Sequence, residues 1–360
     1  MMLLRKMLVP MLVALVVVVT AAGCETDEDS PFDKEGVEID WPTLDPSRYH
    51  WNGVTSPYFE FWAWHIIADD ETNFTITLGI SNPGSDDPDA RGAIVSIASN
   101  RLSAPIAGRY SASKFDGSAQ TLDVTLGNRR GTERVLRGKM DVDVNIAFDL
   151  RLAVDTDWDE SMGLLTNIPG LPLNWHLGGL RARADGSIKI GADTFEFVGA
   201  AAQEDHYWGR EFPGATTRVM ANNFDEDDTS FAMLSGDFLV GIFELPAILM
   251  AFEYQGTLYE FRTPDLDVLV TKIEQGDSLQ YNVVKGDLRL VIDIFDLDDE
   301  PQREPVYDED GPSLGGFVWR DAQVQIEILR RDNAVSPWQT QDVVTSTLAT
   351  LTIAEDDVLY

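Results

Sequence analysis

Apolar and polar residues alternate strictly along large parts of this chain. Between residues 141 and 155, apolar side chains occupy every second position, and polar or charged side chains fill most of the others. The apolar positions are Val142, Val144, Ile146, Phe148, Leu150, Leu152 and Val154. Successive side chains of an extended strand point to opposite faces of a sheet, so this segment is predicted to be a strand with one buried face. Residues 287–297 show the same alternation.

Short apolar runs separated by turn residues predict further strands. They cover residues 74–80, 194–198, 258–261, 268–273 and 324–329. Dipeptides such as Pro-Gly and Asp-Gly between the runs favour turns, and no segment has the apolar period of an amphipathic helix of three turns. Many short antiparallel strands with one apolar face are typical of sandwiches and barrels. The predicted fold class is therefore all-β.

The first residues of the chain have the composition of an export signal. Arg5 and Lys6 precede an apolar run over residues 7–19, and small residues then lead to Cys24, the only cysteine. This order is typical of a secretory signal peptide, and the run is shorter than the roughly 20 apolar residues that span a membrane. We therefore expect a signal peptide over residues 1–23.

The Ala-Ala-Gly-Cys sequence at the end of this segment resembles the bacterial lipobox, in which the cysteine becomes a lipidated N-terminus. The alternative is an ordinary signal peptide followed by a chance cysteine. Acyl chains on Cys24 would anchor the protein in a membrane. The acidic, apolar-poor residues 24–45 are expected to form a disordered tether. The sequence thus predicts a protein anchored in the cell envelope, at the periplasmic face or in the outer membrane.

Charge and motif content exclude several classes of function. The chain has 27 basic and 61 acidic residues, a formal net charge of −34, and such a surface repels a phosphate backbone, so no nucleic-acid partner is expected. Its four histidines lack the spacing of a zinc site, and its acidic runs lack the pattern of an EF-hand. There is no Gly-x-Ser-x-Gly elbow or phosphate-binding loop. No metal and no cofactor are predicted.

Two segments carry unusual combinations of aromatic and ionisable residues. In the first, residues 58–65, a strand would place Tyr58, Glu60, Trp62 and Trp64 on one face. A glutamate among large aromatic side chains is desolvated, which raises its pKa and favours the protonated acid. The alternative is that Glu60 bonds a backbone group or an arginine in a structural core. The second segment joins five such residues: Glu204, Asp205, His206, Tyr207 and Trp208.

These segments give the chain a family resemblance over about residues 48 to 236. The sequence YHWNG…SPYFEFWAWHI resembles the opening of the tocopherol cyclases, and WHLGG resembles their central strand. EDHYWGREFPG is similar to the family's Trp-Gly stretch, and its Asp-His-x-Trp form is closer to the related carotenoid 1,2-hydratases. The tyrosine and aspartate that follow in the hydratase pattern have no clear match, Phe224 and Asp225 being the nearest.

The resemblance implies two tandem lipocalin-like antiparallel β-barrels, here assigned to residues 46–200 and 201–360. It also implies an apolar, often isoprenoid, ligand. Members with known chemistry protonate, hydrate or cyclise carbon–carbon double bonds without a metal or redox cofactor. In the hydratase-like pattern the histidine and tryptophan are functional positions, which correspond to His206 and Trp208, with Asp205 beside them.

Three hypotheses on function follow. The protein binds an apolar, for example isoprenoid, small molecule at the envelope; or it is a cofactor-independent cyclase, hydratase or isomerase that uses acid catalysis; or it is a structural envelope protein with filled barrels. Protonation of an alkene needs a positioned acid, and aromatic faces stabilise a developing cation. The candidate catalytic residues are His206, Asp205 and Glu60. The candidate ligand-binding residues are Trp208, Tyr207, Trp62, Trp64 and Tyr58. A cavity of about 300–1,000 Å³ that reaches His206 would favour a ligand site, and its absence would favour the structural protein.

Overall fold

The computed structural model describes residues 45–354, apart from 55–56, 69–71, 89, 143, 160, 168–170, 213, 241–242, 276–277, 298–299 and 309–310. The predicted signal peptide, Cys24 and the tether up to residue 44 lie outside the described residues. Among the residues described, no helix is long and apolar enough to cross a membrane.

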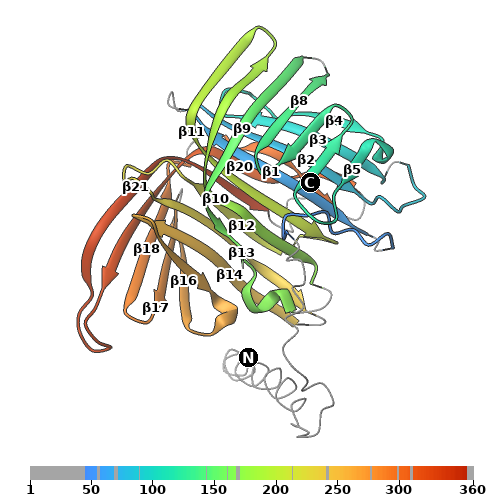
Figure 1. The fold of residues 1–360 in the computed structure, drawn as a ribbon. Coiled ribbons are helices and arrows are strands. Elements are labelled where there is room, and N and C mark those ends of the chain that lie inside the picture. The colour runs from blue at the N-terminus through green and yellow to red at the C-terminus, as the bar shows by residue number, and fades with distance from the viewer. Residues whose placement is uncertain are drawn as a thin grey trace, which may run out of the picture. The chain divides into compact units, whose positions relative to one another are not determined.

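Strands from the N-terminal part of the described chain form one antiparallel sheet of 11 strands (Figure 1). They are β1 (Phe59–Ile67), β2 (Asn73–Ser81), β3 (Gly92–Ser99), β4 (Ile106–Tyr110), β5 (Phe115–Gly117), β6 (Asp123–Leu126), β7 (Arg129–Thr132), β8 (Val135–Asp141), β9 (Asn145–Trp158), β10 (Leu173–Ile190) and β11 (Asp193–Gly209). Their spatial order is β4-β3-β2-β1-β11-β10-β9-β8-β7-β6-β5. The first strand, β1, therefore pairs with the last, β11.

A second antiparallel sheet of 10 strands follows, coloured green to red in Figure 1. Its strands are β12 (Gly214–Ala221), β13 (Ser230–Val240), β14 (Phe243–Tyr254), β15 (Thr257–Arg262), β16 (Val268–Gln275), β17 (Ser278–Lys285), β18 (Leu288–Phe295), β19 (Gln302–Asp308), β20 (Gly311–Arg330) and β21 (Gln339–Ala354). Their spatial order is β15-β14-β13-β12-β21-β20-β18-β17-β16, and β19 pairs with β20. The first strand of this sheet, β12, therefore pairs with its last, β21. Within the described ranges the helices are short 3-10 turns: Ala112–Lys114, Gly163–Asn167 and Thr263–Asp265.

Each sheet is barrel-like and encloses its own apolar core, which confirms the predicted all-β, tandem lipocalin-like class. The first core includes Trp62, Trp64 and Leu150, and the second includes Phe252 and Ile326. The alternation seen in the sequence explains this arrangement, because every second side chain of a strand points inward.

A third apolar cluster contains side chains from both sheets. Phe61 and Tyr207 come from the first sheet, and Leu234 and Leu249 come from the second. Strand β1 is consequently buried on both faces over nearly its whole length. Such a strand has no solvent-exposed face, which agrees with the many aromatic side chains of residues 58–65.

The structure differs from the sequence-based expectation at two boundaries. The continuous strand predicted over residues 141–155 is wrong at its start, because β8 ends at Asp141 and β9 begins at Asn145. The apolar alternation runs on through the hairpin turn, where Val144 is 36% exposed. The domain boundary expected after residue 200 falls inside β11, which continues in the first sheet to Gly209.

Candidate functional site

Pairing of β1 with β11 brings the two unusual segments together and sorts their side chains between two faces. Directly opposed residues of an antiparallel pair point to the same side of a sheet. Glu60 lies opposite Trp208, and Trp62 lies opposite His206; with Trp64 and Glu204 they face the interior of the first barrel. The opposite face carries Phe61 with Tyr207 and Ala63 with Asp205. The predicted site residues therefore form two groups and not one.

The first group surrounds the Glu60 carboxylate, and we call it the Glu60 cluster: Tyr58, Glu60, His50 and His206. The His206 Nε2 atom lies 2.8 Å from Glu60 Oε1, and the His50 Nδ1 atom lies 3.1 Å from the same oxygen. The Tyr58 hydroxyl donates to Oε2 at 2.5 Å. The backbone N–H of His50 donates to both oxygens at 3.0 Å. Two imidazoles thus converge on one carboxylate oxygen.

Flat aromatic stacking holds both imidazoles of this cluster in place. His50 stacks on Trp208 with ring centroids 3.9 Å apart. His206 stacks on Trp62 at 4.6 Å and on Trp208 at 4.7 Å. Trp62 is itself fixed, because its indole N–H donates to the Ser47 carbonyl at 2.8 Å. Trp62 and Trp208 therefore support the cluster, as stacking partners of the two imidazoles.

Burial sets the protonation states in the Glu60 cluster. Glu60 is fully buried, and the loss of hydration raises its pKa well above the usual range, against the opposing effect of the Tyr58 hydrogen bond. The desolvation expected for Glu60 is confirmed. Burial lowers the pKa of His206 well below its ordinary value and that of His50 to about 3. At neutral pH both imidazoles are therefore uncharged, and burial shifts the Glu60 carboxyl group toward its protonated form.

The second group lies on the other face of β1 and β11, and we call it the Asp205 cluster: His65, Asp205, Tyr207 and Arg218. Arg218 Nη1 lies 3.3 Å from Asp205 Oδ2, and His65 Nε2 lies 3.4 Å from Asp205 Oδ1. Burial acts to raise the pKa of Asp205, but the Arg218 guanidinium and His65 outweigh it and hold this pKa below the usual range. Asp205 is therefore ionised and paired with Arg218.

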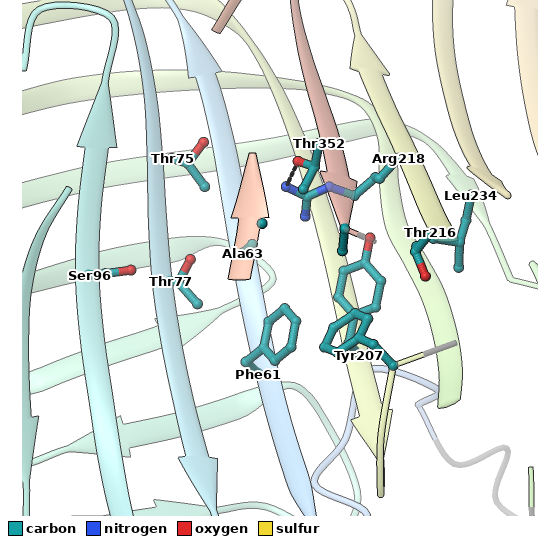
Figure 2. A pocket seen from close by; sticks show the side chains of 13 residues that line it. Phe61, Ala63, Thr75, Thr77, Ser96, Tyr207, Thr216, Arg218, Leu234 and Thr352 are labelled. Carbon is teal, nitrogen blue, oxygen red and sulfur yellow. Dashed lines mark hydrogen bonds between the residues drawn. The ribbon is translucent and has the colours of Figure 1, made fainter. Parts of the chain in front are cut away.

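A small cavity adjoins the Asp205 cluster. It encloses about 70 Å³, and its lining includes the apolar side chains of Phe61, Ala63 and Leu234 together with Tyr207 and Arg218. Figure 2 shows Arg218 bonded to Thr352 on one side of the cavity and the hydroxyls of Thr75, Thr77 and Ser96 on the other. This volume is smaller than the roughly 300–1,000 Å³ of a typical ligand site.

The cavity does not reach His206, an outcome that counts toward a structural role for that residue. Among the predicted site residues Tyr207 lines it, whereas His206 does not. The reason is the strand geometry, because adjacent residues of β11 point to opposite faces. Trp62 and Trp64, predicted as ligand contacts, are packed within the first core.

Sequence reasoning missed three residues that complete these clusters. His50 belongs to the YHWNG run that carried the resemblance, so a signal for it was present. His65 is one of the four histidines that lack metal-site spacing, and neither it nor Arg218 stands out in the sequence. Arg218 lies in β12 of the second sheet, whereas its partner Asp205 lies in β11 of the first. The sequence also predicted no metal, yet ligand atoms of His50, Glu60 and His206 lie within 4.8 Å of one another.

Comparison with solved structures shows which fold this is. CghA matches with a TM-score of 0.51 and 14% identity over 84% of this chain and 90% of that chain. CghA with Sch210972 matches with a TM-score of 0.50 and 14% identity over 83% and 88%. Kievitone hydratase from Nectria haematococca gives a TM-score of 0.46 and 12% identity over 83% and 89%. No protein-family model and no curated protein sequence matches the chain. The likeness to CghA shows a tandem lipocalin-like double-barrel fold.

Proposed function

We propose that this protein binds a small molecule with an apolar body and one oxygen acceptor, at the cavity beside the Asp205 cluster. The observation that carries the proposal is the placement of Arg218. Its Nε atom is buried and makes no hydrogen bond within the described residues, while its two terminal nitrogens bond Asp205 and Thr352. A buried unsatisfied donor costs about 1–3 kcal/mol, which a ligand oxygen would recover.

The surroundings of Arg218 suit such a ligand. Asp205 balances the guanidinium charge, so the cavity offers a strong donor without a large net charge. Phe61, Tyr207 and Leu234 supply apolar contact area. This combination of apolar walls with a few placed polar groups is common in small-molecule sites. That CghA, which shares the fold, was crystallised with Sch210972 supports the proposal at the level of the fold.

The volume of the cavity limits what it accommodates. About 70 Å³ suits the oxygen-bearing end of a ligand, and an isoprenoid chain would need the cavity to widen between the sheets. The cavity is lined by residues of both sheets, among them Phe61 of β1 and Leu234 of β13. We therefore place the ligand between the sheets.

An acid-catalysed cyclase or hydratase is the alternative, and the protonation states favour binding over it. Asp205 adjoins the cavity but has a lowered pKa, so it is ionised at neutral pH and has no proton to donate. His206 is uncharged because its pKa is lowered. Burial shifts Glu60 toward its protonated form, yet it lies on the opposite face of β1 from the cavity-lining Phe61. None of the three candidate acids both carries a proton to donate and lines the cavity.

Filling the cavity tests the binding proposal. Ala63→Val adds two carbon atoms to the cavity wall and is expected to weaken ligand binding about 5- to 160-fold, since overpacking a tight site costs about 1–3 kcal/mol. Native mass spectrometry of the protein incubated with envelope lipid extract would measure the bound fraction. Ala153→Val, on an exposed position of β9, is the control. A bound fraction that Ala63→Val leaves unchanged would contradict the proposal, as would an absence of bound molecules from the unsubstituted protein.

We also propose that the protein is anchored to a membrane of the cell envelope through lipid on Cys24, on the basis of the lipobox-like Ala-Ala-Gly-Cys sequence. Cys24→Ser is expected to move the protein from the membrane pellet to the soluble fraction, because the acyl chains, each CH₂ contributing about 0.8 kcal/mol, would be lost. Fractionation with immunoblotting, and radiolabelled palmitate incorporation, would measure this. Retention of the Cys24→Ser protein in the membrane pellet would refute the lipid anchor.

A further inference from the structure

We propose that His50, Glu60 and His206 form a binding site for a divalent transition-metal ion, for which Zn²⁺ is the reference. The ion would fasten the segment 45–51, which carries His50, to strands β1 and β11. This inference is independent of the ligand proposal, because the Glu60 cluster and the cavity lie on opposite faces of β1 and β11.

The donor atoms lie close enough to one another to converge on one ion. Zinc lies about 2.0–2.2 Å from nitrogen and oxygen ligands, so neighbouring ligand atoms of a tetrahedral site lie about 3.3–3.6 Å apart, and the donor atoms here would separate by about 0.2–0.8 Å around the ion. His206 Nε2 and His50 Nδ1 lie 2.8 and 3.1 Å from Glu60 Oε1. All three donor atoms fall within 4.8 Å of one another. Two imidazoles and one carboxylate form a set that binds zinc and other first-row metals.

The two ring nitrogens of His206 have different surroundings. Nε2 faces Glu60 Oε1 at 2.8 Å, and the buried Nδ1 has no hydrogen-bond partner within the described residues. A neutral imidazole carries one N–H and one lone pair. With the N–H on Nδ1, Nε2 presents its lone pair to Glu60, and a proton or a cation can lie between the two atoms.

A divalent ion can bond Glu60 and both imidazoles, whereas a single proton on Glu60 can bond only one of them. One carboxyl proton can lie between Oε1 and only one of the two imidazole nitrogens. An ion accepts electron pairs from both nitrogens and from the carboxylate at once. Tyr58 bonds Oε2, and the ion would bind Oε1, the oxygen that both rings approach and that also accepts the His50 backbone N–H.

The surroundings are rigid and give the ion one route of access. Stacking on Trp62 and Trp208 fixes both rings. The side chains of Glu60 and His206 are 0% exposed, whereas that of His50 is 13% exposed. An ion would therefore reach the site past His50. Because His50 precedes β1 in the chain, its coordination would join residues 45–51 to the barrel.

Metal binding to the purified, EDTA-treated full chain tests the site directly. Isothermal titration with Zn²⁺ is expected to show one site, and His206→Gln or Glu60→Gln should weaken it about 100-fold or more, since even outer partners of metal ligands cost 10–100-fold. His65→Gln is the matched control, because His65 is equally buried but lies on the other face of β1. Its Zn²⁺ affinity should equal that of the unsubstituted protein.

A spectroscopic measurement separates coordination from a structural role of these residues. Electron paramagnetic resonance of the Cu²⁺-loaded protein should show hyperfine coupling to two imidazole nitrogens, and His50→Gln should reduce this to one. Added Zn²⁺ should also slow amide exchange of residues 45–51 in the unsubstituted protein but not in folded His50→Gln. Loss of Zn²⁺ binding in His65→Gln to the same extent, a Cu²⁺ spectrum without two nitrogens, or no binding by the unsubstituted protein would overturn the inference.

Discussion

Arg218→Met is expected to destabilise the protein by about 3–5 kcal/mol, the cost of leaving one member of a buried ion pair without its partner. Asp205 is 0% exposed, and the Arg218 side chain, 3.3 Å away, is 10% exposed. Methionine keeps most of the apolar stem of arginine but no charge. Denaturant unfolding followed by tryptophan fluorescence would measure the difference in the free energy of unfolding.

Two further variants test the cause of that loss. Asp205→Asn combined with Arg218→Met should recover a large part of the lost stability, because neither member of this buried pair is then charged. Arg130→Met is the control: Arg130 pairs with Asp123 at 2.7 Å, but these side chains are 44% and 36% exposed. An exposed pair contributes about 0–1 kcal/mol. Equal losses for Arg218→Met and Arg130→Met would show that the buried pair does not stabilise the fold in this way.

Gly209→Ala is expected to cost about 3 kcal/mol, at the upper end of the range for overpacking. A Cβ atom at this position would lie 2.1 Å from the Pro172 carbonyl oxygen and 3.0 Å from the Leu173 Cα atom. Both are backbone atoms, so β10 and β11 would have to separate. The hydrogen bond from the Arg210 N–H to that carbonyl, 2.7 Å long, would be lost as well. Thermal and denaturant unfolding would measure the change.

Gly179→Ala provides the comparison for this substitution. Gly179 lies in β10 beside the same strand, but a Cβ atom there would meet its nearest neighbour at an ordinary 3.4 Å. We expect a change in unfolding free energy within about 1 kcal/mol, as for most substitutions without a clash. If both variants lose the same stability, close backbone approach is not the reason for the glycine in the Trp-Gly motif.

The alternation of side chains was sufficient to predict the fold class and the face of β1 that carries Glu60. Both follow from local geometry, since a period of two determines which residues share a face. The hairpin turn between β8 and β9 was missed because Val142 and Val144 continue the apolar pattern through it. A turn cannot be recognised from apolar positions alone when every second residue stays apolar through it.

The composition of the two clusters could not be predicted in the same way. Glu60 and His206 are 146 residues apart in the chain, and only the pairing of β1 with β11 brings them together. That pairing also places His206 and Tyr207 on different faces, so one contiguous motif contributes to two separate polar clusters. Arg218 reaches Asp205 from the next sheet, and the size of the cavity depends on packing between sheets. The spacing of residues along the chain reveals neither the contact of Arg218 with Asp205 nor the size of the cavity.

The pairing of the first strand with the last in each sheet has a consequence for how the chain reaches its native state. Long-range pairings of this kind slow folding, because the intervening chain must be ordered before they form. During N-to-C synthesis β1 emerges long before β11, and β12 long before β21. Until its partner strand arrives, the aromatic β1 has an open hydrogen-bonding edge, which makes such an intermediate prone to aggregation. Each barrel can therefore close only after its whole length of chain has been made.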